Sequence, residues 1–181
     1  MSLSKTPRRR LVRLRARAKD GDLDAQLELA LRLNYGDGLS RSHRAARRWY
    51  ERAAAQGSAQ AMVNLGRMLA LGEGGPANRK RANELYRRSA ELGNAVAMHN
   101  LGGIYRRGRG VKRDVRRAFA WLVKAAELGD HDAMLQCEEL AEEHGFALAP
   151  RRMTRWLRRA AEAGDPEAMA SFGVHLFEGR G

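Results

Sequence analysis

The feature that most constrains the fold of this chain is a repeat of 36 residues. An alanine recurs at Ala25, Ala61, Ala97 and Ala133, and again at Ala168 after a step of 35 residues. A fixed period of about 20 to 50 residues is typical of stacked repeat arrays, in which each unit buries its apolar side only against its neighbours. The chain is therefore expected to offer an extended surface rather than a reaction centre.

Glycines followed by capping residues indicate where helices should end and begin. Glycine ends a helix by adopting the left-handed conformation, and the Asp, Ser or Asn after it caps the next helix. Such pairs recur once per repeat, at Gly21-Asp22, Gly57-Ser58, Gly93-Asn94, Gly129-Asp130 and Gly164-Asp165. Between them a Gly-x-Gly recurs, at Gly36/Gly38, Gly72/Gly74, Gly108/Gly110 and Gly179/Gly181. The pattern predicts an all-α, right-handed solenoid of antiparallel helix pairs, with helix A before each Gly-x-Gly and helix B after it.

An apolar stripe on each helix indicates the side that should be buried. The third repeat shows the stripe of helix A, at Ala97, Met98, Leu101 and Tyr105. Gly102 lies beside this stripe, where the absence of a side chain would let a neighbouring helix approach, and Gly66 and Gly173 are in phase with it. The Trp, Tyr and Met residues of both helices are expected to pack in the core.

The register divides the chain into a basic N-terminal capping helix and one repeat array. The predicted bounds are 1–21 for the capping helix and 22–181 for the array, with repeats at about 22–57, 58–93, 94–129 and 130–164 and a half repeat at 165–181. Phe172, Leu176 and Phe177 of the half repeat would have no helix B to cover them. The sequence therefore predicts a fragment, or an end covered by a partner or by a second copy in a homodimer.

The repeat resembles the Sel1-like repeat, a relative of the tetratricopeptide repeat. The third repeat carries the resemblance, in Ala97, Leu101, Gly102, Tyr105, Gly108, Gly110, Val111, Asp114, Ala118, Trp121, Ala125, Ala126 and Gly129. Ser42 and Asn78 depart from the pattern, because they stand where the family has Asp. The resemblance implies a scaffold or adaptor in protein complexes, often in bacteria, and it supplies no catalytic residues.

Basic residues recur in phase along helix B, which should form the outer, convex layer. The chain has a net charge of +13, and two rows of cations run through the repeats: Arg44, Lys80, Arg116 and Arg151, and then Arg52, Arg88, Lys124 and Arg159. Rows spaced by the 8–10 Å of packed helices would attract an acidic protein or a polyanion. The alternative is a solvated face whose arginine content reflects genome composition.

Sequence-independent binding of nucleic acid or anionic surfaces is the alternative function. The Arg-rich N-terminus and the convex rows favour it, with a marked salt dependence. No aromatic residues are interleaved with these arginines in the sequence, so stacking on single-stranded bases has no support. No recognised nucleic-acid-binding module is present either.

The remaining face of helix A should line a concave groove. Its predicted partner-binding residues are Glu28, Leu31, Val63, Asn64, Arg67, His99, Asn100 and Gln136. An apolar row beside an amide-rich row suits a peptide, because Asn and Gln both donate and accept hydrogen bonds to its backbone. Equally, the amides could tie their own repeat to its neighbour.

The sequence gives no support for catalysis, a metal or a cofactor. The histidines follow no metal-binding spacing, and the glycine-rich turns lack the Gly-Lys-Ser/Thr ending of a phosphate loop. Cys137, the single cysteine, aligns with Leu29, Leu65, Leu101 and Phe172 and is expected to be a small buried hydrophobe. Arg106 and Arg107 are in phase with Glu142 and Glu143, so the acidic residues near 138–143 are expected to pair within the chain.

The expected partner is another protein or peptide in the cytoplasm, in an adaptor, regulatory or effector-immunity role. With one cysteine no internal disulfide is possible, which suits a reducing compartment. No apolar run is long enough to span a membrane, and arginines interrupt the apolar residues at 11–18.

Overall fold

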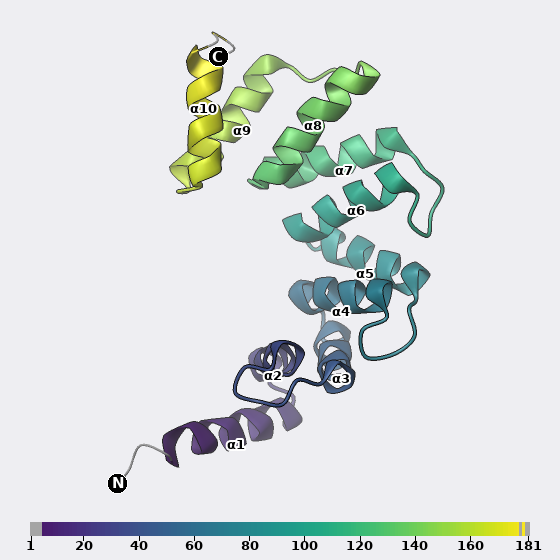
Figure 1. Ribbon diagram of the computed structural model, residues 1–181, viewed down its shortest axis with the longest axis vertical. Coiled ribbons are helices and arrows are strands. Elements are labelled where there is room, and N and C mark those ends of the chain that lie inside the picture. Colours follow the sequence, from purple (N-terminus) through teal and green to yellow (C-terminus); the bar gives the residue numbers. More distant parts are fainter. Residues whose placement is uncertain (1–4, 178, 180–181) are drawn as a thin grey trace. The chain divides into compact units, whose positions relative to one another are not determined.

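The computed structural model describes residues 5–177 and residue 179, and within these it describes all side chains except those of residues 5–8 and 150. This part of the chain holds ten α-helices and no strand (Figure 1), which confirms the predicted all-α fold. The backbone divides between Ser89 and Ala90 into two compact units.

The helices of each unit follow one another as the repeat predicts. The N-terminal unit contains α1 (Lys5–Lys19), α2 (Leu23–Tyr35), α3 (His43–Ala55), α4 (Ala59–Leu71) and most of α5 (Arg79–Glu91). The C-terminal unit contains α6 (Ala95–Arg107), α7 (Val115–Glu127), α8 (His131–His144), α9 (Pro150–Glu162) and α10 (Pro166–Phe177). Even-numbered helices correspond to helix A, and odd-numbered helices to helix B.

The predicted turns between helices form as the glycines and caps require. Gly57 has a φ of 91°, which favours glycine, and it ends the turn after α3. The Ser58 hydroxyl then accepts a hydrogen bond from the Ala61 N–H at 3.2 Å and caps α4. Helix B is capped in the same way even where the family's Asp is missing, because Ser42 and Asn78 accept from backbone N–H groups at the start of α3 and α5.

The core of the N-terminal unit lies between its A and B helices. Its largest fully buried side chains are Tyr50, Met62, Leu65, Met68 and Leu69. In α1, Leu14 and Ala18 are buried at the positions where the phase places Tyr50 and Ala54. A buried amide links three helices, since Gln26 of α2 donates to the Ala18 carbonyl at 3.1 Å and accepts from Gln56 at 2.8 Å.

The C-terminal unit repeats this arrangement around Leu122, Met134, Cys137, Leu140 and Leu157. Cys137 is fully buried, as predicted, and burial raises the pKa of its thiol to about 12. The thiol is therefore protonated at neutral pH and acts as a small apolar side chain.

The aromatic residues are only in part core residues, which corrects the sequence prediction. Tyr86 and Trp156 are buried, but Trp49 and Trp121 are half-buried and Tyr35 is 70% exposed. The physical reason is that the two half-buried rings lie beneath basic side chains, which cover the faces that the core leaves open.

Close contact between helix A and helix B depends on a glycine. A methyl group at Gly102 would lie 2.6 Å from Cγ of Leu122, and one at Gly66 would lie 3.1 Å from the ring of Tyr86. A methyl group at Gly173 in α10 would have no atom within 4 Å. The close approach of helices predicted from the sequence is thus present at Gly102 and Gly66 and absent at Gly173.

These glycines provide a matched test of the packing. Gly102→Ala should lower the free energy of unfolding by about 1–3 kcal/mol, because Leu122 or the helix backbone must move. Gly173→Ala should raise it by about 0.5–1 kcal/mol, because alanine favours a helix and meets no obstacle there. Thermal and urea unfolding followed by circular dichroism measures both, and equal effects of the two substitutions would contradict the role assigned to Gly102.

Candidate partner-binding surfaces

The face of helix A in the N-terminal unit carries only part of the predicted groove surface. Leu31 is 39% exposed, and Arg67 is half-buried in an ion pair with Glu73 at 3.1 Å. Asn64 is also half-buried. Val63, however, is only 6% exposed and belongs to the core. It is therefore not available to a partner.

A hollow of about 490 Å³ lies between α1 and α2 in the same unit. Its lining combines a basic rim with two leucines: Arg10, Leu11, Arg13, Leu14, Arg17, Glu28 and Arg32. Glu28 pairs with Arg32 at 2.8 Å, and Arg17 pairs with Asp22 at 2.8 Å. Glu28 was predicted to bind a partner, but the hollow itself could not be predicted, because its shape depends on how α1 packs against α2.

Two of the four arginines of this hollow stand at register positions that are alanine in the next repeat. Arg10 and Arg17 are one repeat before Ala46 and Ala53, both of which are fully buried. In α1 these positions have long charged side chains, and Arg10 is exposed. Within the described residues, Arg10 and Arg13 form no ion pair. Alignment of the repeats could have revealed these two positions, because an arginine stands there in place of a buried alanine.

In the C-terminal unit, three polar side chains on the helix A side form a network. Nδ1 of His99 donates to Oδ1 of Asp130 at 2.9 Å, and Gln136 Nε2 lies 3.1 Å from His99 Nε2. The same Asp130 oxygen caps α8 by accepting from the Ala133 N–H at 2.8 Å. His99 and Gln136 were predicted as partner-binding residues. The structure joins them by a hydrogen bond between two successive A helices, α6 and α8.

The charges of this network shift the pKa values of both partners. The hydrogen bond to Asp130 raises the pKa of His99 above its ordinary value of 6.5. Burial alone would raise the pKa of Asp130, but the hydrogen bonds from His99 and from the Ala133 backbone outweigh it, and the pKa falls below 3.8. Asn100 is likewise engaged within the chain, since its Nδ2 donates to the Val96 carbonyl at 2.8 Å.

The predicted outer basic residues are all exposed. They are Arg44, Arg52, Lys80, Arg88, Arg116, Lys124, Arg151 and Arg159. The guanidinium of Arg52 lies 4.5 Å from the ring centroid of Trp49, and the Lys124 ammonium lies 4.5 Å from that of Trp121. Aromatic rings therefore do adjoin these cations, contrary to the sequence prediction, because residues three apart share one face of a helix.

The acidic face of α8 pairs within the chain, but with a different register from the predicted one. Arg106 forms an ion pair with Glu139 at 2.6 Å rather than with Glu142 or Glu143. Glu139 lies one turn earlier on the same face, and helical side chains lean toward the N-terminus of their helix. In the described part of the chain no three His, Cys, Asp or Glu residues gather to hold a metal ion.

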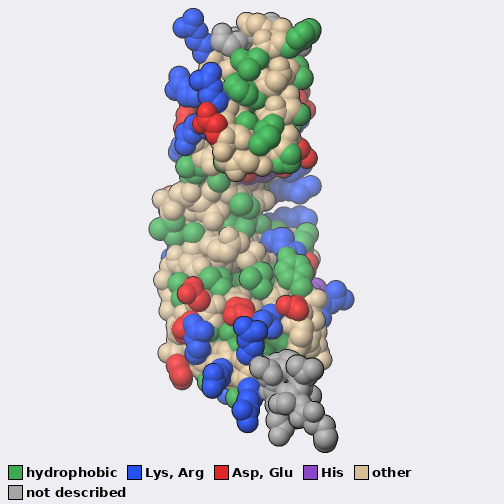
Figure 2. Space-filling model, turned by 90° about the vertical axis from the view of Figure 1, so that its left-hand side faces the viewer, with side chains coloured by type: hydrophobic (Ala, Val, Ile, Leu, Met, Phe, Trp, Pro, Cys, Tyr) green, Lys and Arg blue, Asp and Glu red, His purple; other side chains and the backbone are tan. Residues whose placement is uncertain are grey.

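Apolar side chains of α10 remain exposed at the C-terminal end of the molecule, where hydrophobic side chains gather in Figure 2. Leu176 is 51% exposed and Phe177 is 91% exposed, in agreement with the exposure expected for these two side chains. Phe172 is half-buried, with the Arg158 guanidinium 5.6 Å from its ring centroid. In the same view, Lys and Arg side chains lie among Asp and Glu side chains over the N-terminal helices.

The repeat can now be assigned to a family. The model of the Sel1 repeat matches residues 23–58, 59–94, 95–130 and 154–165. The chain belongs to the Sel1 repeat family. No curated protein matches it.

Solved structures of Sel1 repeat proteins resemble this chain. A Sel1 repeat protein from Oxalobacter formigenes is 34% identical, with a TM-score of 0.72 over 86% of this chain and 62% of its own. The protective antigen c5321 of uropathogenic Escherichia coli, described as having an SLR fold, is 29% identical, with a TM-score of 0.76 over 92% of this chain and 36% of its own. Cysteine rich protein B of Helicobacter pylori, 18% identical, shares the fold, with a TM-score of 0.56 over 73% of this chain and 95% of its own.

This Sel1 repeat chain thus spans about three fifths of the length of the Oxalobacter protein and about a third of the length of c5321. None of the helices in its described part is both long enough and apolar enough to cross a membrane.

The His99–Asp130 pair should make stability depend on pH. The contribution of the pair to the free energy of unfolding is complete below the pKa that His99 has in the unfolded chain, and it is lost as the pH rises through the higher pKa of His99 in the folded chain. At acid pH it is lost again, as the pH falls below the ordinary pKa of Asp130 and through its lower pKa in the folded chain. The melting temperature of the wild type should therefore fall as the pH rises above about 6.5. His99→Asn should cost about 1 kcal/mol at pH 6 and flatten this profile. His43→Asn is the control, and an unchanged profile in His99→Asn would rule out the pair as its source.

Proposed function

We propose that this Sel1 repeat protein is an interaction scaffold that holds an acidic peptide or protein element in the hollow between α1 and α2. Sel1 repeat proteins are generally protein-interaction scaffolds without enzymatic activity. The specific proposal rests on the charge of the hollow of about 490 Å³. Four arginines line it, and Glu28 is the one acidic residue among the described lining residues.

The chemistry of the hollow favours carboxylates. Guanidinium groups bind carboxylates through two parallel hydrogen bonds, which gives both affinity and orientation. Glu28 and Asp22 already pair with Arg32 and Arg17, so Arg10 and Arg13 are the cations left for a ligand within the described residues. An acidic side chain from a partner would bind to these two arginines first.

The shape of the hollow favours a peptide segment. A volume of about 490 Å³ lies in the range of about 300–1,000 Å³ that is common for ligand sites. Leu11 is half-buried in its lining and offers an apolar contact beside the charges. Exposed Leu31, one turn from Glu28 on α2, extends the apolar surface for the next residue of the peptide.

The proposed setting is the cytoplasm of a bacterial cell, in an adaptor, regulatory or effector-immunity complex. The single buried cysteine suits a reducing compartment. The most similar structures described above come from bacteria.

A charge-reversal experiment tests the acidic partner. A fluorescent oligoglutamate peptide is titrated with the wild-type protein and with the double variant Arg10→Glu, Arg13→Glu, and anisotropy is measured. The double variant should weaken binding at least about tenfold, because two attractive charges become repulsive. The control Arg116→Glu, Arg151→Glu makes the same charge change at exposed sites of the other unit and should have a much smaller effect.

If the chain instead binds nucleic acid, DNA rather than oligoglutamate should be the tighter ligand. Electrophoretic mobility shifts with single-stranded and duplex DNA, at low and moderate salt, would then show tight and strongly salt-dependent binding. The half-buried Trp49 beside Arg52 is the observation that favours it. Binding of DNA that is much tighter than binding of oligoglutamate, and equally sensitive to both double variants, would overturn the acidic-peptide proposal.

A further inference from the structure

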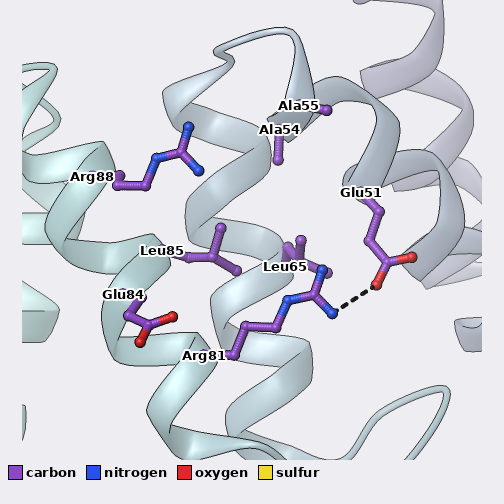
Figure 3. A pocket seen from close by; sticks show the side chains of 8 residues that line it. All are labelled: Glu51, Ala54, Ala55, Leu65, Arg81, Glu84, Leu85 and Arg88. Atoms are coloured by element: carbon purple, nitrogen blue, oxygen red, sulfur yellow. Dashed lines mark ion pairs between the residues drawn. The ribbon is translucent and has the colours of Figure 1, made fainter.

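A second hollow, of about 230 Å³, lies on the helix B side of the N-terminal unit, between α3 and α5 (Figure 3). Its lining comes from α3, α4 and α5, and consists of Glu51, Ala54, Ala55, Leu65, Arg81, Glu84, Leu85 and Arg88. Leu65 and Leu85 form an apolar floor, and the charged side chains surround it. The Arg81 guanidinium pairs with Glu51 at 3.6 Å and closes one side.

One repeat earlier, the corresponding place is filled by a tryptophan. Trp49 of α3 packs against a cluster that includes Ala18 and Leu29. A step of 36 residues converts these two into Ala54 and Leu65, which line the hollow, and converts Trp49 into Leu85. Two of the other helix B segments also have tryptophan at this position, Trp121 in α7 and Trp156 in α9, whereas α1 has Arg13. The hollow is therefore the space that an indole ring occupies in the preceding repeat.

A basic residue covers the tryptophan ring in two other repeats, and the hollow has a basic residue, Arg88, at the same register position. Arg52 covers Trp49, and Lys124 covers Trp121 in the same way, each three residues after the ring. Arg88 stands three residues after Leu85 and is exposed at the rim of the hollow. In the described structure Arg88 has neither an aromatic ring nor a carboxylate as its partner.

We propose that this hollow takes one tryptophan side chain from a partner protein, which stacks against Arg88 as Trp49 stacks against Arg52. The proposal rests on the scaffold function but uses a different surface from the arginine-lined hollow. A volume of about 230 Å³ is below the range of about 300–1,000 Å³ of sites for whole small molecules, and so it suits a single side chain. The apolar floor gives a water molecule few polar partners, which favours an apolar occupant.

The charges at the rim match an indole rather than an aliphatic side chain. Arg88 offers a guanidinium for the face of the ring, an interaction that is strongest with tryptophan. The Glu84 carboxylate lies one turn before Arg88 on α5 and lines the same hollow, where it can accept a hydrogen bond from the indole N–H. A leucine or valine would use neither group.

The test uses N-acetyl-L-tryptophanamide as the probe and two-dimensional ¹H–¹⁵N NMR of the full chain as the readout. In the wild type, the amide signals of Ala54, Ala55, Leu85 and Arg88 should shift in a saturable way. Leu85→Trp should abolish these shifts, because it fills the hollow from within and restores the arrangement of the preceding repeat. Arg88→Ala should weaken probe binding about two- to fivefold. Lys80→Ala, exposed on α5 outside the hollow, is the matched control and should leave binding unchanged.

Separate outcomes distinguish this proposal from the acidic-peptide proposal. Leu85→Trp should still bind oligoglutamate, and Arg10→Glu, Arg13→Glu should still bind the tryptophan probe. Absence of saturable shifts at these amides up to the solubility limit of the probe, or the same shifts in Leu85→Trp, would overturn the indole site. If Leu85→Trp does not fold, as judged by circular dichroism, Leu85→Phe and Arg88→Ala apply the same test. A wild-type oligomer in light scattering that dissociates in Leu85→Trp would show that a second copy occupies the hollow, and would overturn a separate partner.

Discussion

The structure depends on the burial of small residues where successive helices meet. Each helix is 12 to 15 residues long, a length at which isolated helices are marginal in water. Stability therefore comes from packing, and the closest contacts are made by side chains with little or no bulk. Ala46, Ala82 and Ala118 recur in phase with no exposed surface, and Gly66 and Gly102 admit the side chains of the following helix. At these positions the small residue provides the clearance that the neighbouring helix needs.

Departures from this register create the two candidate sites. Where the register requires alanine, Arg10 and Arg17 leave a charged hollow between α1 and α2. Where it favours tryptophan, Leu85 leaves an apolar hollow beside an unused cation. In both cases the surrounding repeat fixes the shape of the space, and the substituted residue fixes its chemistry. A stacked fold can acquire a binding site in this way without a new loop or a change of backbone.

Those features that follow from phase were predictable from the sequence, and those that follow from side-chain direction were not. Helix ends, caps and the burial of Leu14, Ala18 and Cys137 agree with the period, because each depends on local geometry or on alignment with a neighbour. The partner of Arg106 and the burial of Val63 depend on how far side chains lean across an interface, which the period does not contain. The hollow beside Leu85 was predictable only in part. The aligned repeats show leucine in place of tryptophan, but they do not show that the smaller side chain leaves a hollow.

The two proposed contacts would have different effects on the formation of a complex. Unpaired arginines attract an acidic partner over a distance of about the Debye length, about 8 Å at physiological salt, and chiefly accelerate association. A buried indole acts only on contact, and chiefly slows dissociation. Because both hollows belong to the N-terminal unit, a partner that carries acidic residues and a tryptophan at a suitable spacing would gain from both. Selectivity for such a partner then requires no reaction centre, only the three residues at which this chain departs from its own repeat, Arg10, Arg17 and Leu85.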